Sequence, residues 1–333
     1  MKKYLIAVLI AFVSLSACKK DKKDKESPYM AGSLQFSLPK YLLPNQEIEL
    51  SASGITDPTE NITYKWIARG FTEDTLVGQS VKFTSKDTIG FFSMSLTATH
   101  PDFPSRTYSL TTNIINPNSK ESFSGIKPTD LTITDPRDSK VYFIKKYGNL
   151  YWFVENLRWK DLGFPYEKEE ALTDIYGYLY TWNQATGGVS SSGLGNGPQG
   201  VCPPGWSIPT KEDWEDFASF NLNTSTNFDN EWNGLGESSS ITASLNGNAI
   251  WRYSPDNNKS NSNGFNALPG GSTSNEFKSF SNMYSFGFWW SSTEHNSNSG
   301  LYRFIHFDRA TFPYNFANKS QFAASVRCVK LAN

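Results

Sequence analysis

The sequence has few residues suited to metal or thiol chemistry. Its 333 residues include three Cys and three His. The histidines, His100, His295 and His306, show none of the spacings typical of a metal site. We therefore predict no metal ion and no cofactor.

An excess of charge of either sign is also absent. Lys and Arg number 31 against 32 Asp and Glu, a formal net charge of -1. A nucleic-acid-binding protein usually carries a clear basic excess, so we expect no nucleic-acid partner. Charged residues make up 19% of the chain, which excludes a highly charged disordered chain.

Long hydrophobic runs are missing except at the N-terminus. Lys2 and Lys3 precede an apolar run over residues 4–15, which is too short to span a bilayer and is typical of a signal peptide. The run ends in Leu-Ser-Ala-Cys, closing at Cys18. This pattern matches a bacterial lipobox, so we predict a signal peptide over 1–17 and lipidation of Cys18. An ordinary secretory signal with a stray thiol remains the alternative.

A charged, apolar-free stretch follows the cysteine. Residues 19–26 hold five Lys and three acidic residues, which predicts a solvated tether over 18–28. Position Lys19 is not the Asp that would suggest retention in the inner membrane. The stretch resembles the surface-export signal of Bacteroidetes lipoproteins, although a plain spacer stays open. We expect an outer-membrane lipoprotein that is exposed on the cell surface.

Aromatic residues are abundant, with 10 Trp, 16 Tyr and 24 Phe. This content suits a β-rich extracytoplasmic protein and carbohydrate contact. In residues 29–117, short β-rich runs recur between turn signals with no convincing helix, which predicts a sandwich of about seven strands with Trp66 in its core. The segment resembles PKD-like or immunoglobulin-like modules. A polar linker with a proline, residues 116–122, then separates a second domain over 123–333.

The second domain opens with a predicted hairpin over residues 140–153. A helix is expected over 211–220, with Thr210 as its N-cap and Asp213 in the first turn. Trp214, Phe217 and Ala218 would form its buried stripe.

Six short motifs stand in order along this second domain. In sequence order they are Thr134-Asp135-x-Arg137-Asp138, Trp152-x-x-Glu155-Asn156-Leu157, Tyr176-Gly177-x-Leu179-Tyr180-Thr181-Trp182, Cys202-Pro203-x-Gly205-Trp206-x-x-Pro209-Thr210, Trp289-x-Ser291-Ser292-Thr293-Glu294 and Val326-Arg327-Cys328-Val329. The series resembles the Fibrobacter succinogenes major paralogous (FISUMP) domain. That family is similar to C-type-lectin-like folds and has no established reaction, so we expect a non-enzymatic α+β head.

The resemblance also implies roles for particular residues. Lectin-like folds tie the segment before the helix to the last strand, which implies a Cys202–Cys328 disulfide. The motif tryptophans are expected in the core, and Glu155 and Asn156 are expected to be structural rather than ligand-binding. The turn Asp135–Asp138 could bind calcium, but turn chemistry is favoured.

Candidate ligand-binding residues lie in the polar insert from about 222 to 288. They are Trp232, Trp251, Tyr253 and Tyr284, whose rings could stack on sugars or anchor a protein if they are exposed. Alternatively, each ring plugs its own loop. The predicted function is a surface-exposed lipoprotein that binds a glycan or a cell-surface protein, as a possible accessory subunit of an outer-membrane transporter complex. The alternative is a structural or adhesive component, such as a fimbrial or matrix subunit.

Overall fold

The computed structural model describes residues 29–70, 74–126 and 128–332. The predicted signal peptide, Cys18 and the tether lie outside the described residues. Within those ranges, no helix combines the length and apolar character needed to cross a membrane.

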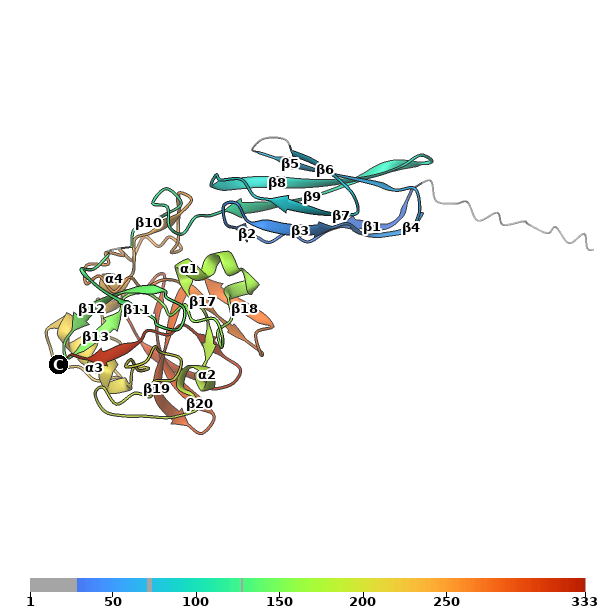
Figure 1. The fold of residues 1–333 in the computed structure, drawn as a ribbon. Helices are drawn as coiled ribbons and strands as arrows, with labels where there is room; N and C mark the ends of the chain where they lie inside the picture. The colour runs from blue at the N-terminus through green and yellow to red at the C-terminus, as the bar shows by residue number, and fades with distance from the viewer. Residues whose placement is uncertain (1–28, 71–73, 127, 333) are drawn as a thin grey trace, which may run out of the picture.

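Residues 31–114 form nine strands and no helix in the part of this segment that the structure describes. The strands are β1 (Ala31–Gln35), β2 (Tyr41–Leu42), β3 (Glu47–Ser51), β4 (Ser53–Asp57), β5 (Thr63–Arg69), β6 (Asp74–Val77), β7 (Ser80–Thr84), β8 (Gly90–His100) and β9 (Phe103–Ile114). A five-stranded sheet in the order β2-β9-β8-β5-β6 faces the pairs β1–β4 and β3–β7 (Figure 1). The predicted all-β segment is confirmed.

Trp66 lies at the centre of this sandwich. It is fully buried, as predicted, and its indole Nε1 donates to the Gly78 carbonyl oxygen over 2.9 Å. The Phe36 ring packs edge-on against it, 5.1 Å between centroids. Alternating residues of β5 and β8 supply a large part of the core, because side chains two apart on a strand face the same side.

The second part of the chain, which we call the head, holds the remaining elements. Its strands are β10 (Phe123–Ser124), β11 (Leu131–Thr134), β12 (Val141–Tyr147), β13 (Leu150–Phe153), β14 (Tyr180–Thr181), β15 (Ser244–Leu245), β16 (Asn248–Ala249), β17 (Gly270–Ser274), β18 (Ser279–Met283), β19 (Phe286–Asn296), β20 (Ser299–His306), β21 (Tyr314–Asn318), β22 (Ala323–Ala324) and β23 (Val329–Leu331). Its helices are α1 (Thr173–Tyr176), α2 (Trp182–Thr186), α3 (Lys211–Leu222) and α4 (Leu235–Ser239), with short 3-10 turns at Tyr166–Lys168 and Glu170–Leu172. The head is therefore β-rich with few helices.

The last strand of the head closes on its first strands. The sheet order is β11-β12-β13-β23, and Trp152 of β13 pairs with Val329 of β23. The predicted hairpin is confirmed as β12 and β13, joined by a turn at Gly148 with φ of +56°. A Cβ at Gly148 would lie 2.3 Å from an Asp216 carboxylate oxygen, so glycine is required there for two reasons.

Helix α3 covers this sheet, and its start is as predicted. The Thr210 hydroxyl accepts from the Asp213 backbone N–H, and the Asp213 carboxylate accepts from the Thr210 N–H, which forms a capping box. Trp214, Phe217 and Ala218 are fully buried. The helix runs to Leu222, two residues beyond the prediction, because Asn223 adopts the left-handed conformation that ends it.

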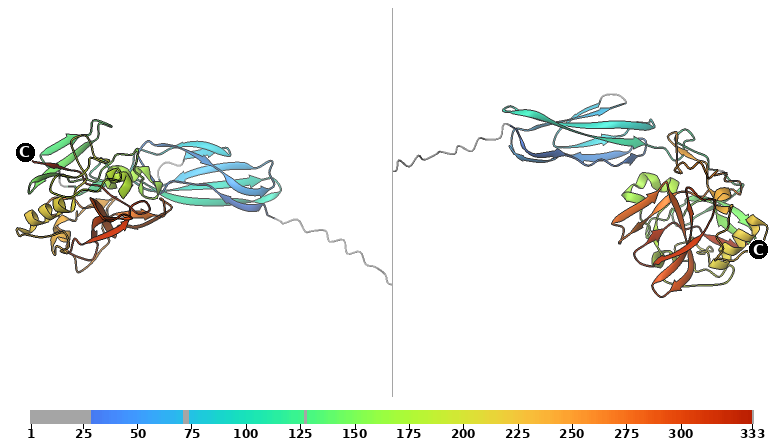
Figure 2. Two further views of the ribbon diagram at one scale, coloured as in Figure 1. Left: turned by 90° about the horizontal axis from the view of Figure 1, so that it is seen from below. Right: turned by 180° about the vertical axis from the view of Figure 1, so that it is seen from behind.

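The sandwich and the head meet at a polar joint. The Tyr41 and Tyr284 hydroxyl groups lie 2.7 Å apart, and the Lys40 backbone N–H donates to Glu169. The Asn246 side-chain amide donates to the Asn113 side chain and to the Ile114 carbonyl oxygen, each over 2.8 Å. Figures 1 and 2 show the head at one end of the sandwich, with β1 and β4 toward the other end.

Candidate functional site

Trp232 is the first of the predicted ligand-binding residues, and it is buried. Only 3% of it is exposed, and its Nε1 donates to the Asn227 carbonyl oxygen over 2.9 Å. The Arg303 guanidinium lies 3.3 Å from the ring centroid, with Phe228 on another side of the same cation. The expectation of an exposed stacking ring at Trp232 is wrong, because a buried arginine occupies its face.

Trp251 is buried as well, with 4% exposure. Its Nε1 donates to the Ala267 carbonyl oxygen over 3.2 Å, and the ring belongs to the main apolar core of the head. The ring fills space between the insert and the central strands. The prediction that Trp251 exposes its ring to a ligand is therefore also wrong. The alternative that these rings plug their own region holds for both tryptophans.

The two predicted tyrosines differ from each other. Tyr253 is 82% exposed, so its ring is free to meet a ligand. Tyr284 is half-buried and its hydroxyl contacts Tyr41 of the sandwich. Burial is the main cause that raises the pKa of Tyr284 well above its usual range, and the hydrogen bond with Tyr41 raises this pKa further. Tyr284 therefore belongs to the joint between the two parts.

The motif residues Asn156, Trp289 and Arg327 form a buried network. The Asn156 Oδ1 accepts from Arg327 Nε over 2.8 Å and from Trp289 Nε1 over 2.9 Å. Its amide nitrogen donates to the Tyr176 carbonyl oxygen and to the Ser325 hydroxyl. Since Asn156 is 2% exposed, the network is structural, as the sequence predicted.

Arg327 is fully buried at the centre of the head. Its Nη1 and Nη2 donate to the carbonyl oxygens of Phe265 and Asn266 over 2.9 and 2.8 Å. Desolvation lowers its pKa to about 9, against a weaker opposite effect of the Glu155 carboxylate. The residue stays charged at neutral pH because backbone oxygens replace its lost hydration.

Glu155 is also engaged within the protein. One carboxylate oxygen accepts from the Phe143 backbone N–H over 2.7 Å, and the other lies 3.3 Å from Arg158 Nη1. The carboxylate thus completes the hydrogen bonding of β12 where β13 ends. This is the structural role expected from the sequence.

The two head cysteines form the implied disulfide. Cys202 and Cys328 are bonded, and both are fully buried. The bond joins the segment before α3 to the residue before β23, and it closes 126 residues of chain.

The turn at Asp135 shows no sign of a calcium site. Desolvation raises the pKa of the Asp135 carboxyl, but hydrogen bonds from Arg137 outweigh it and lower the pKa overall. The two side chains form a two-pronged ion pair, with Arg137 Nη2 2.6 Å from one carboxylate oxygen. Among the described residues, no group of three or more His, Cys, Asp or Glu could hold a metal ion.

An exposed aromatic surface lies elsewhere, on β21. Tyr314 is 36% exposed and Phe316 47%, and they stand two residues apart on the edge strand of the β19-β20-β21 sheet. The exposed His295 ring of β19 stacks on Phe316, 4.2 Å between centroids and 9° between planes. We call Tyr314, Phe316 and His295 the β21 platform. Sequence reasoning missed it, although the alternation Tyr-Asn-Phe within a polar stretch carries the signal.

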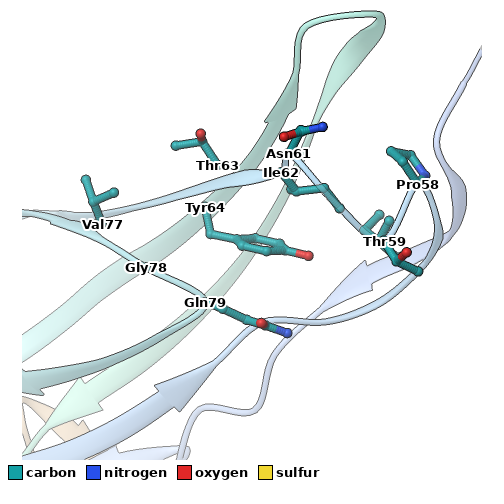
Figure 3. A pocket seen from close by; sticks show the side chains of 10 residues that line it. Pro58, Thr59, Asn61, Ile62, Thr63, Tyr64, Val77, Gly78 and Gln79 are labelled. Carbon is teal, nitrogen blue, oxygen red and sulfur yellow. The ribbon is translucent and has the colours of Figure 1, made fainter.

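Two clefts complete the candidates. One of about 450 Å³ lies on the sandwich between the segment after β4 and strands β5 and β6, where the Tyr64 side chain points between Ile62 and Gln79 (Figure 3). The other, of about 830 Å³, lies between the linker and the head and includes Phe143 and Arg158 among its lining residues. We call the second one the linker cleft.

The head is β-rich and closed by one disulfide, and its motif tryptophans, Trp152, Trp182, Trp206 and Trp289, lie in the core. The sequence profile of the Fibrobacter succinogenes major domain matches residues 146–330, and the chain belongs to this family. The family is not one of known enzymes, and membership indicates a surface-type protein. No curated protein matches the chain.

Proposed function

We propose that this protein is a lipid-anchored, cell-surface binding protein whose head binds a glycan on the β21 platform. The observation that carries the proposal is the set of exposed rings at Tyr314, Phe316 and His295. A sugar ring presents an apolar face of C–H groups. When this face stacks on an aromatic ring, apolar surface is removed from water, which favours binding.

The spacing and surroundings of the platform suit a chain of sugars. Tyr314 and Phe316 are two residues apart on one strand, so their side chains project to one side about 7 Å from each other. The exposed side chain of Asn318 lies on the same face of β21 as Tyr314 and Phe316, and the exposed side chain of Asn298 lies on the neighbouring turn. Amides of this kind donate to and accept from sugar hydroxyl groups.

The anchor and the sandwich fit the same function. The lipobox at Cys18 would fix the N-terminus to the outer membrane. Stable membrane anchoring needs about two membrane-binding groups, and a lipobox cysteine carries about three acyl chains. The sandwich, for which we propose a PKD-like or immunoglobulin-like fold, then lies between the anchor and the head. This order supports display of the head beyond the cell surface.

For the head we propose a C-type-lectin-like fold. The pairing of β13 with β23 and the Cys202–Cys328 bond support this assignment, because such folds bring their terminal strands together in this way. A role in nutrient capture beside an outer-membrane transporter is the finer form of the proposal.

A glycan array probed with the full mature chain tests the function. We expect binding to a defined set of oligosaccharides that Phe316→Ala and His295→Ala both weaken. Tyr253→Ala is the control, since it removes an even more exposed ring from another part of the head. Absence of binding to every glycan would refute the proposal, and loss in Tyr253→Ala alone would move the site to the insert.

A further inference from the structure

The linker cleft takes no part in the proposed glycan site. It has a volume of about 830 Å³, within the range of pockets that hold a small molecule or a peptide end. Its lining includes linker residues from Pro117 to Lys120, the first residues of the head from Phe123 to Ile126, and β12 with Glu155, Arg158 and Asp174.

Apolar side chains from both sides line part of this cleft, which we call its apolar wall. They come from Phe123, Ile126, Val141 and Phe143. Val141 is 50% exposed and Ile126 and Phe143 are only partly buried, so the wall meets water in the free protein. A ligand with an apolar group would remove this surface from water, which favours binding.

Cationic groups also line the cleft. Arg158 has a side chain only 14% exposed, and its Nε is buried with no hydrogen-bond partner. Lys140 Nζ donates to the Arg158 carbonyl oxygen over 2.9 Å. The Lys120 ammonium group has no hydrogen bond or ion pair in the part of the chain that the structure describes.

The acidic groups of the cleft cancel only part of this positive charge. Glu155 already accepts from the Phe143 N–H and from Arg158, so its oxygens are occupied. Asp174 is the second carboxylate of the lining, which leaves three cations against two anions. A buried donor without a partner and an unpaired ammonium group both favour an anionic oxygen ligand.

We propose that the linker cleft binds a carboxylate that carries an apolar group, with the carboxylate toward Arg158 and Lys120 and the apolar group against Val141 and Phe143. Two sources have this chemistry: a free aromatic or branched carboxylic acid, and the C-terminal residue of a peptide. The site is independent of the β21 platform, so either proposal can fail without the other.

The test is a titration of the full mature chain followed by NMR of its isoleucine and valine methyl groups. The probes are N-acetyl-phenylalanine, its amide, and an acetylated trialanyl-phenylalanine peptide with a free or an amidated C-terminus. We expect saturable shifts at Val141 and Ile126, none at Val77 on the sandwich, and binding about tenfold weaker for each amide. Tighter binding of the free peptide acid than of the free amino-acid derivative would identify a peptide end as the source.

Two charge-reversal variants test the site, one inside the cleft and one outside it as a control. Lys120→Glu should weaken binding of the acids by roughly tenfold or more, because it replaces an attractive charge with a repulsive one. Lys146→Glu makes the same change in net charge on β12 at a residue outside this cleft and should leave binding unchanged. Equal binding of acids and amides, equal effects of the two variants, or no saturable shift in the millimolar range would each overturn the proposal.

Discussion

Replacement of Asn156 by leucine tests the assignment of the family motif to the core. The side chain is 2% exposed and uses its oxygen twice and its nitrogen twice, in bonds to Arg327, Trp289, Tyr176 and Ser325. Leucine has nearly the same volume but accepts and donates nothing. Asn156→Leu therefore leaves Arg327 Nε, Trp289 Nε1 and the Tyr176 carbonyl oxygen without partners.

The size of the effect follows from these orphaned groups. Each buried polar group without a partner costs about 1–3 kcal/mol, with charged groups at the upper end. Three such groups give a loss of about 3–9 kcal/mol in the free energy of unfolding. A domain usually has about 5–15 kcal/mol in total, so we expect a head that is barely folded at 37 °C.

Urea unfolding followed by tryptophan fluorescence measures this loss. The head holds every tryptophan except Trp66, so the signal reports on the head. The control is Asn183→Leu, at an exposed position of α2, which should change stability by less than about 0.5 kcal/mol. A loss below about 1 kcal/mol for Asn156→Leu would refute the reasoning. Normal stability together with lost ligand binding would place Asn156 in a binding site instead.

Three further predictions concern the anchor, the disulfide and pH. Cys18→Ala should move the protein from the membrane fraction to the soluble fraction; a variant that stays membrane-bound would contradict the lipobox assignment. The double variant Cys202→Ala/Cys328→Ala should lose about 5 kcal/mol of stability in the chain-entropy model, because the bond closes 126 residues; an unchanged urea midpoint would contradict this. Burial raises the pKa of Asp213 to about 6, against hydrogen bonds that lower it. Protonation therefore favours the folded state, and stability from this group is present below pH 4 and lost as pH rises through about 6, by on the order of 2–3 kcal/mol. Urea midpoints of the wild type and Asp213→Asn at pH 4.5 and 7 check the sign, since the variant should lack this dependence.

Local patterns in the sequence predicted the elements that local interactions determine. The hairpin of β12 and β13 follows from a glycine turn between two β-rich runs, and the start of α3 follows from Thr210 and Asp213. Both signals involve residues close together in the chain. Their physical cause is therefore visible without the fold.

The site predictions failed where the partner is distant in sequence. Trp232 is buried because Arg303, 71 residues further along, lies against its ring. Tyr284 is held by Tyr41, which is separated from it by 243 residues. Nothing near Trp232 or Tyr284 in the sequence indicates these contacts, whereas Tyr253 stays exposed.

For a related reason, the sequence does not show that the aromatic residues of the β21 platform are exposed. A run such as Tyr314-Asn315-Phe316 suits an edge strand and a central strand equally well. Only the sheet order shows that β21 has a neighbour on one side alone and keeps both rings exposed. Exposure of an aromatic residue is a property of the assembled sheet.

Labelling of intact cells with a fluorescent oligosaccharide chosen from the array tests the central claim most directly, since it requires anchoring, display and binding together. Cells with the wild-type protein should bind the probe at their surface. Cells with Phe316→Ala should need about tenfold more probe for the same labelling, at equal amounts of surface protein. Equal labelling of wild-type and Phe316→Ala cells would contradict the claim that the β21 platform binds the glycan.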